Sequence, residues 1–436
     1  MSGQLGNGTT IDRHIPGRVE GLDQIISVSA GSSHNLALRI DGTVWAWGSN
    51  GSGQLGDGTT INRSMPIQIT SLTDVVAVSA GLSHSLALRA DGTVWAWGSN
   101  SSGRLGDGTT TNRLSPVRLN GISDVAGIAA GSSHSSAIKK DGSVWTWGNN
   151  QTGQLGDGTT VQKLVPKELS NSNLYNIVKV VAKESTILAL RADGTIWAWG
   201  QGSSGQLGDG GTSNRLSPVQ VSGISDAIDI DMGQWHGMAL LRDGTLMSWG
   251  ANGSGQLGDG SDTSRLLPVN ITMFANITSI GTGYSHSLVF MKDGSLWAWG
   301  QNVFGQVGNG TAGSQTPPAH VFTEERYIKL SVSDFELALG DELVIEATVY
   351  SDNIEDKQIT FVSSNANVAT ITSNGTVKGT GLGTATLTAR TPSGETFTDA
   401  LVKVIPHQYE KGLFIPFDDL DLEVGAEVPF SPKFTR

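Results

Sequence analysis

Five histidines recur at one position of a repeated sequence, and four of them directly follow a serine. They are His34, His84, His134, His236 and His286. An imidazole acting as a general base can activate a serine hydroxyl. Adjacent residues of a strand point to opposite faces, however, so a neighbouring Ser-His pair is poorly placed for proton transfer. We therefore predict no catalytic residue and no enzyme activity, and we expect the rings to pack between repeats with their nitrogens bonded to nearby backbone.

The acidic residues likewise give no prediction of a metal or cofactor. One aspartate recurs in each of five "LGDG" loops, at Asp57, Asp107, Asp157, Asp209 and Asp259. Calcium needs several oxygen ligands close together, so one aspartate per loop is too few and a turn-forming role is expected. Three more lie in "SDAIDIDMG", where strand alternation separates Asp226 from Asp229 and Asp231. The chain has no cysteine, which excludes disulfides and thiolate ligands.

These residues belong to a tandem unit of about 50 residues. The second tryptophan of each unit returns at intervals of 50 or 52 residues, at Trp47, Trp97, Trp147, Trp199, Trp249 and Trp299. Each unit holds four short runs, which we call strands A ("VVAVSAG"), B ("SHSLALR"), C ("TVWAWG") and D (for example "PIQIT", expected to begin at a proline). Asp-Gly joins B to C, a hairpin signal in which both turn residues are expected to have positive φ. Four short strands per repeat predict the blades of a β-propeller.

Side-chain alternation predicts how the blades pack. In strand B, His84, Leu86 and Leu88 share one face, and in strand C, Trp95 and Trp97 share one. We expect a bulky Trp/Leu face on each blade to fill an Ala/Gly face on the next, with each buried tryptophan contributing a few kcal/mol. No blade can bury such a face alone, so stability is expected to depend on neighbouring blades.

The unit "AGLSHSLALRADGTVWAWGSNSSGRLGDGTT" resembles the repeat of the regulator of chromosome condensation family, over residues 1–322. The fold class implied is all-β, with six complete four-stranded blades and a partial one. Seven loops of the "GQLG" type and seven Pro-led D segments stand against six A–B–C sets. We favour a seven-bladed parent in which strands A to C of the first blade are missing. The alternative is a six-bladed ring whose last blade is closed by the N-terminal D strand.

Residues 327–405 differ in character and predict an immunoglobulin-like β-sandwich, because about seven short alternating runs are separated by turn signals. The stretch "FVSSNANVATITSNGTVKGTGLGTATLTA" resembles the group 2 bacterial immunoglobulin-like domain. That family is usual on secreted or surface-attached bacterial proteins, which implies an extracellular or cell-surface location; a cytoplasmic one is the alternative. No signal peptide is visible, and one would belong to the missing N-terminal part. Residues 406–436 are a tail or the start of another domain.

Charge and hydropathy narrow the range of partners. The formal net charge is −12 and no run is rich in lysine or arginine, whereas binding a nucleic acid requires cations that displace phosphate counterions. No stretch reaches the ~18 apolar residues of a membrane span. We therefore predict neither a nucleic-acid partner nor a membrane span, and we expect a monomer.

The loop between strands A and B varies most among the units, and equivalent loops of a propeller gather on one end. Apolar side chains ringed by polar ones are typical of protein interfaces. We therefore predict a protein-binding face, with a surface glycan or a cell-wall association as the alternative. Its candidate residues are Leu82, Lys183, Glu184, Gln234, Trp235, Tyr284 and Phe304.

The family resemblance implies two modes of binding. One member class acts on a small GTPase through a hairpin inserted in one blade, and no unit here exceeds 52 residues, so that hairpin is missing. The propeller-type β-lactamase inhibitor grips its target with loop aromatics on one face. The second mode fits the pattern of this chain better, although neither mode identifies the partner.

Overall fold

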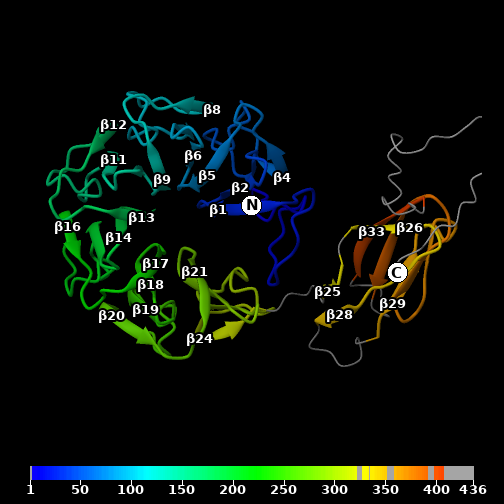
Figure 1. The fold of residues 1–436 in the computed structure, drawn as a ribbon. Coiled ribbons are helices and arrows are strands. Elements are labelled where there is room, and N and C mark those ends of the chain that lie inside the picture. Colours follow the sequence, from blue (N-terminus) through cyan, green and yellow to red (C-terminus); the bar gives the residue numbers. More distant parts are fainter. Residues whose placement is uncertain (1, 322–326, 333, 351–357, 391–396, 407–436) are drawn as a thin grey trace, which may run out of the picture. The chain divides into compact units, whose positions relative to one another are not determined.

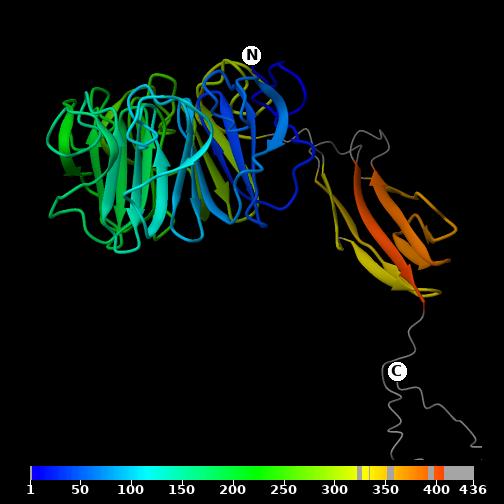
Figure 2. The same ribbon diagram turned by 90° about the horizontal axis from the view of Figure 1, so that it is seen from above.

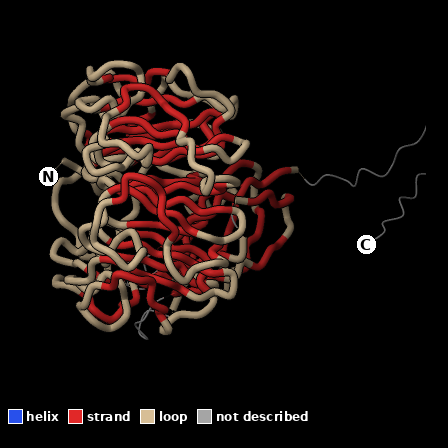
Figure 3. The backbone as a smooth tube through the Cα atoms, turned by 90° about the vertical axis from the view of Figure 1, so that its left-hand side faces the viewer, coloured by secondary structure: helices blue, strands red, loops and turns tan. Residues whose placement is uncertain are grey.

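The computed structural model describes residues 2–321, 327–332, 334–350, 358–390 and 397–406. Contacts divide the chain into two compact units, residues 1–324 and 325–436. The described residues contain strands, turns and loops but no helix (Figure 3). Apart from Pro406, the predicted tail of residues 406–436 lies outside the described residues.

The first unit contains six four-stranded antiparallel sheets, each built from consecutive strands. Their bounds are, blade by blade, β1 Ile25–Ala30, β2 His34–Arg39, β3 Val44–Gly48, β4 Arg63–Gln68; β5 Val75–Ala80, β6 His84–Arg89, β7 Val94–Gly98, β8 Arg113–Arg118; β9 Val125–Ala130, β10 His134–Lys139, β11 Val144–Gly148, β12 Lys163–Glu168; β13 Ile177–Lys183, β14 Thr186–Arg191, β15 Ile196–Gly200, β16 Arg215–Gln220; β17 Ala227–Met232, β18 His236–Leu241, β19 Leu246–Gly250, β20 Arg265–Ile271; β21 Ile277–Thr282, β22 His286–Met291, β23 Leu296–Gly300, β24 Gln315–His320. We number these sheets blades 1 to 6.

The six blades stand around a common axis, as predicted for a propeller. Strand A of each blade is innermost and strand D is outermost (Figure 1). The strands run across the thickness of the disc (Figure 2). Consequently the A–B and C–D loops lie at one end of the disc, and the B–C turns and D–A loops lie at the other.

The Asp-Gly turns differ from the expected geometry. Of the two residues of the blade 1 pair, Asp41 and Gly42, only Gly42 has a positive φ, of 78°, and its amide donates to the Arg39 carbonyl at 3.0 Å. This is a type I turn followed by a left-handed glycine, one of the common longer hairpin connections. The aspartate's role is to accept hydrogen bonds from the backbone and hydroxyl of Thr43. The expectation of positive φ at both residues was therefore wrong.

Strand D begins before its proline rather than at it. β4 starts at Arg63, three residues ahead of Pro66, and the pairing with strand C shifts register between Ala46 and Gly48. The extra residues on β4 form a bulge that includes the proline. Proline is tolerated there because D is an edge strand and a bulge needs no regular ladder bond.

The bulky residues are not gathered on one face, which corrects the predicted packing. Register pairs Ala87 with Trp95 and Ser85 with Trp97, so the tryptophans share a face with alanine and serine. Leu86 lies opposite Ala96 on the other face. In blades 2 to 6 the second tryptophan therefore packs against apolar residues of the preceding blade. Trp97, for example, joins one buried cluster with Leu36, Leu38 and Leu55 of blade 1. The five interfaces between successive blades are built in this way.

The N-terminal segment does not complete blade 6. Strand β24 is the D strand of that blade, so the six-bladed alternative closed by an N-terminal strand is wrong. Residues 2–19 lie instead between the loops of blade 6 and the outer part of blade 1 (Figure 1). The segment after Pro16 forms no strand, because it has no strand C to pair with.

The described residues of the second unit form nine short strands, in sheets ordered β26-β33-β32-β29, β27-β31-β30 and β25-β28. Their bounds are β25 Tyr327–Leu330, β26 Phe335–Ala338, β27 Glu342–Val344, β28 Ala347–Tyr350, β29 Thr360–Ser363, β30 Ala369–Ile371, β31 Thr376–Gly379, β32 Gly383–Arg390 and β33 Phe397–Ile405. Val377, Leu387 and Val402 lie in its buried core. These are the expected immunoglobulin-like strands.

Candidate functional site

The predicted binding residues lie at one end of the propeller. Leu82, Glu184, Gln234, Trp235 and Tyr284 belong to A–B loops, and Lys183 ends strand A of blade 4. Phe304 belongs to a C–D loop. The two kinds of loop are joined directly, since the amide of Ser99 donates to the Ser83 carbonyl at 2.8 Å.

Backbone hydrogen bonds join three pairs of A–B loops, those of blades 2 and 3, 3 and 4, and 5 and 6. The amide of Leu82 donates to the Gly131 carbonyl at 3.3 Å, and that of Ser132 to the Glu184 carbonyl at 2.9 Å. The amide of Gln234 donates to the Tyr284 carbonyl, also at 2.9 Å. This end of the disc is therefore held by main-chain contacts, which leaves the loop side chains available for other contacts.

The apolar candidates differ in exposure. Leu82 is 37% exposed, Tyr284 52% and Phe304 61%. Trp235 is half-buried, as are Gln234, Lys183 and Glu184. The structure brings the candidates of blades 4 to 6 onto neighbouring loops, while Leu82 belongs to blade 2 and Phe304 lies at the far side of blade 6.

Charged residues of blades 4 and 5 lie near Trp235 and Tyr284. Burial raises the pKa of Glu184, with the nearby Lys183 opposing the shift. Burial likewise raises the pKa of Asp231, which accepts hydrogen bonds from the amide and hydroxyl of Thr282. A further ion pair joins Lys179 to Asp229 with an N–O distance of 2.6 Å. Asp229 and Asp231 of "SDAIDIDMG" thus make contacts between blades, a role that the sequence did not indicate.

Four of the recurring histidines, His34, His84, His134 and His236, are fully buried between blades, whereas His286 of blade 6 is less completely buried. The Nε2 atoms of His34, His84 and His236 lie 2.9–3.0 Å from the hydroxyl of a serine in the next blade. In the His34 pair the hydroxyl of Ser85 itself donates to the Gln54 carbonyl at 2.8 Å, so the imidazole must be the donor. The Trp97 indole donates to that same carbonyl. For these three rings the partner is a side chain rather than the backbone that we expected, because the ring reaches across to the neighbouring blade. His134 instead interacts with the backbone of Glu184.

A glycine three residues before each histidine makes room for the ring. A Cβ placed on Gly31 would lie 2.6 Å from Cε1 of His34, and the other four histidines crowd their glycines in the same way. Blade 4 departs at both positions, with Lys183 in place of the glycine and Thr186 in place of the histidine. The smaller threonine removes the steric need for glycine.

Burial strongly lowers the pKa of these histidines. It holds the pKa of His34 and His286 at about 4 and that of His134 and His236 at about 3. For His84 the pKa is well below its usual value. A group that stays uncharged and enclosed at neutral pH suits packing and offers no accessible base.

The "LGDG" aspartates are engaged within their own loops. Asp57 accepts hydrogen bonds from Asn50, Thr59 and Arg63. The fully buried Asn50 also accepts the amide of Leu55 at 2.9 Å, and so anchors the loop. Sequence reasoning missed this asparagine, although its recurrence three residues after the second tryptophan was visible. Among the described residues no cluster of His, Asp or Glu could hold a metal ion.

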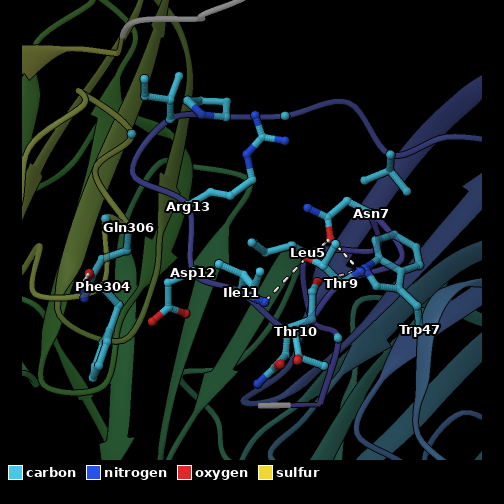
Figure 4. A pocket seen from close by; sticks show the side chains of 18 of the residues that line it. Leu5, Asn7, Thr9, Thr10, Ile11, Asp12, Arg13, Trp47, Phe304 and Gln306 are labelled. Carbon is cyan, nitrogen blue, oxygen red and sulfur yellow. Dashed lines mark hydrogen bonds between the residues drawn. The ribbon is translucent and has the colours of Figure 1, made fainter.

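A cavity of about 760 Å³ lies between blades 6 and 1. The N-terminal residues 3–19 line most of it, with Trp47 on one side and Phe304 and Gln306 on the other (Figure 4). Ser32 also lines the cavity. Phe304 therefore belongs to this cavity as well as to the A–B loop end. Sequence reasoning placed it only on the latter.

Comparison with known proteins identifies both units. The family described as RCC1-like domain matches residues 1–335, and the bacterial Ig-like domain (group 2) matches residues 328–398. The chain is 36% identical over 72 residues to kappa-carrageenase of Pseudoalteromonas carrageenovora, and 45% identical over 49 residues to the human regulator of chromosome condensation. These matches cover 16% and 11% of this chain, and only 18% and 12% of those relatives.

Solved structures show the same propeller fold. Prp20p from Saccharomyces cerevisiae has a TM-score of 0.67 at 24% identity, covering 74% of this chain and 84% of its own. Human WBSCR16 has a TM-score of 0.66 at 25% identity, covering 73% and 86%. Yeast RCC1 (Prp20) in its complex with Kap60 has a TM-score of 0.62 at 24% identity, covering 69% and 75%. None of the described residues belongs to a helix that could cross a membrane.

Proposed function

The chain belongs to the RCC1-like domain family, and from this premise we propose that it is a non-enzymatic protein-binding module whose contact surface is the A–B loop end of the propeller. Propellers of this fold bind proteins: Prp20p has been described with its binding to Gsp1p and histones, and yeast RCC1 with Kap60. Those partners belong to those proteins. The A–B loop surface proposed here comprises Leu82, Lys183, Glu184, Gln234, Trp235 and Tyr284.

The observation that carries this proposal is that the exposed Tyr284 and the half-buried Trp235 lie on two A–B loops joined by a backbone hydrogen bond. Aromatic side chains supply much of the binding energy of protein interfaces when polar groups surround them. Here Lys183 and Glu184 provide such groups on a neighbouring loop. The main-chain bonds between loops hold the surface in place before a partner arrives, which reduces the entropy lost on binding.

Partner capture from a bacterial extract and from culture medium tests the surface. Trp235→Ala with Tyr284→Ala should reduce cross-linked capture of the specific partner by at least about tenfold, since interface aromatics commonly contribute 2 kcal/mol or more each. Tyr175→Ala is the matched control, because Tyr175 is also 52% exposed but lies in a D–A loop at the other end of the disc. Circular dichroism should show that both variants are folded.

Two outcomes would contradict the proposal. One is a partner that the double variant retains and Tyr175→Ala loses. The other is saturable binding to a purified surface glycan, or hydrolysis of a cell-wall polymer, that the double variant leaves unchanged.

An extracellular or cell-surface location forms part of the same proposal. It is supported by the match of residues 328–398 to a bacterial Ig-like domain. Fractionation of the producing bacterium tests it: the chain should be found in the medium or be removed from intact cells by added protease. Recovery only in the protease-protected cytoplasm would refute the location while leaving the binding surface open to the capture experiment.

A further inference from the structure

One of the "GQLG" loops departs from the others at its second residue. Blade 2 has Arg104 there, and every other such loop has a glutamine: Gln4, Gln54, Gln154, Gln206, Gln256 and Gln306. Each glutamine closes its own turn, because its Oε1 accepts the backbone amide two residues earlier at 2.8–2.9 Å. An arginine side chain carries donors and no acceptor. Arg104 is therefore unable to make the bond that closes the other loops.

The backbone of the blade 2 loop nevertheless follows the same course. The amide of Gly103 donates to the Asn100 carbonyl at 2.9 Å. In blade 1 the amide of Gly53 makes the same bond to the Asn50 carbonyl at 2.8 Å. The amide of Ser102 therefore keeps the position from which the other loops bond a glutamine oxygen, but it has no acceptor among the described residues.

The guanidinium of Arg104 is buried without an acidic partner. Arg104 is 6% exposed, and it forms no ion pair with any residue that the structure describes. Its Nη1 donates to the Ser132 carbonyl at 2.9 Å and its Nη2 to the Ser101 hydroxyl at 2.8 Å. Its Nε has no acceptor within the described part of the chain. By contrast, the more exposed Arg113 pairs with Asp107 at an N–O distance of 2.7 Å.

The charge of Arg104 acts on its surroundings. Burial is the main cause of the low pKa of His84 and of His134, and the positive charge of Arg104 lowers both further. A buried charge without a counter-charge is far less favourable than a paired one. A negative ion beside the guanidinium removes this penalty, which the glutamines of the other loops do not incur.

Three donors of this loop are available to such an ion. They are the amide of Ser102, the Nε–H of Arg104 and the hydroxyl proton of Ser101, whose oxygen already accepts from Nη2 of the arginine. Ser101 is exposed and Ser102 is half-buried, so the loop is reached from solvent. A water molecule accepts from such donors but leaves the charge unbalanced, whereas an anion does both.

From this arrangement we infer that Ser101, Ser102 and Arg104 form a binding site for a small monovalent anion such as chloride. The ion takes the place that the glutamine oxygen has in the other loops. That place is enclosed, since Gln54 and Gln154 are only 4% and 1% exposed. A halide therefore fits and a bulky anion such as gluconate does not. The site lies at the A–B loop end and does not depend on the protein-binding proposal.

Replacing gluconate by chloride at constant ionic strength tests the site on the full chain. The melting temperature of the propeller should rise saturably by about 2 °C or more, because a ligand that binds only the folded state stabilises it. Arg104→Gln should abolish this rise, since glutamine removes the charge and supplies the acceptor of the other loops. Arg118→Gln is the matched control, because it removes an exposed positive charge from strand D of the same blade and should leave the rise unchanged.

Chlorine-35 NMR detects the ion without relying on stability. The original chain and Arg118→Gln should broaden the chloride resonance more than Arg104→Gln does, because only they hold the ion. In gluconate alone, Arg104→Gln should melt at a higher temperature than the original chain, since it no longer buries an unpaired charge.

Three results would overturn the inference. The first is a melting temperature of the original chain that chloride leaves unchanged, which would show that water completes the loop. The second is an equal effect of chloride on the original chain and on Arg104→Gln. The third is loss of the effect in Arg118→Gln, which would indicate general screening of positive charge rather than binding at this loop.

Discussion

At the scale of single residues, the buried histidines show how a repeated position is used. The ring of His84 donates from Nε2 to Ser135 of the next blade at 2.9 Å, and the Ser135 hydroxyl donates to a backbone carbonyl. His134 has no equivalent partner, because the corresponding residue of blade 4 is Ile187. Its burial is nevertheless complete. Packing is therefore the common property of these rings, and the serine bond is added where the next blade provides it.

The buried histidines predict a loss of propeller stability in mild acid. Their pKa values are lowered on folding, so the unfolded chain binds more protons between about pH 6.5 and pH 4. Stability should be fully present above pH 6.5 and should fall by about 1.4 kcal/mol per pH unit for each such histidine. Urea denaturation from pH 7.5 to 4.5 measures this slope.

His84→Gln should reduce that slope by the contribution of one histidine, about 1.4 kcal/mol per pH unit, and should also lower the free energy of unfolding at pH 7.5. The Ig-like unit is an internal control, because its described residues contain no histidine. A propeller transition whose midpoint does not change over this pH range would contradict the lowered pKa values.

At the scale of elements, the connection between strands A and B couples two positions. In five blades the glycine that follows strand A lies against the ring of the histidine that opens strand B, and a Cβ on that glycine would overlap the ring. Blade 4 replaces both, and its strands β13 and β14 still pair in regular register. The hairpin itself therefore tolerates either pair of residues, and sterics between the two side chains decide which combinations fit.

Gly131→Ala should destabilise the chain by about 1–3 kcal/mol, since the new methyl group would overlap the His134 ring. In a His134→Thr background the added cost of Gly131→Ala should fall to within about 0.5 kcal/mol, the usual error of additivity. A double-mutant cycle by urea denaturation measures this coupling. Equal costs in both backgrounds would show that the glycine is needed for its backbone rather than for the ring.

At the scale of the whole molecule, stability in a propeller depends on each blade's neighbours. Blades 2 to 5 have a blade on both sides, whereas blades 1 and 6 each have one face toward the N-terminal segment and its cavity. The exposure of Val28 and Phe290 follows from this arrangement. Blades 1 and 6 should therefore be the least stable of the six blades.

Hydrogen exchange should show this gradient. Amides of β10 and β14, in the middle of the ring, should exchange most slowly, and those of β1 and β22 should exchange at least about tenfold faster, because fewer buried contacts hold them closed. Mass spectrometry of peptic peptides from the native protein measures these rates. Uniform protection across all six blades would show that the N-terminal segment closes the ring as firmly as a blade does.

Much of this architecture is encoded locally. The period of the tryptophans, the Asp-Gly turns and the alternation within each strand predicted six four-stranded blades and an Ig-like unit, and the fold agrees. Alternation alone gave the expectation that a histidine and the serine directly before it point to opposite faces. These features are local because turn chemistry and strand period involve residues a few positions apart.

Only the tertiary structure decided how strands and blades face one another. Local patterns do not predict the register that pairs Trp97 with Ser85, nor the hydrogen bond that Ser85 accepts from His34. They do not predict the exposure of Phe290 either. A strand's alternation defines two faces without saying which neighbour covers each. That choice depends on hydrogen-bond register and on the packing of blades about 50 residues apart in the chain.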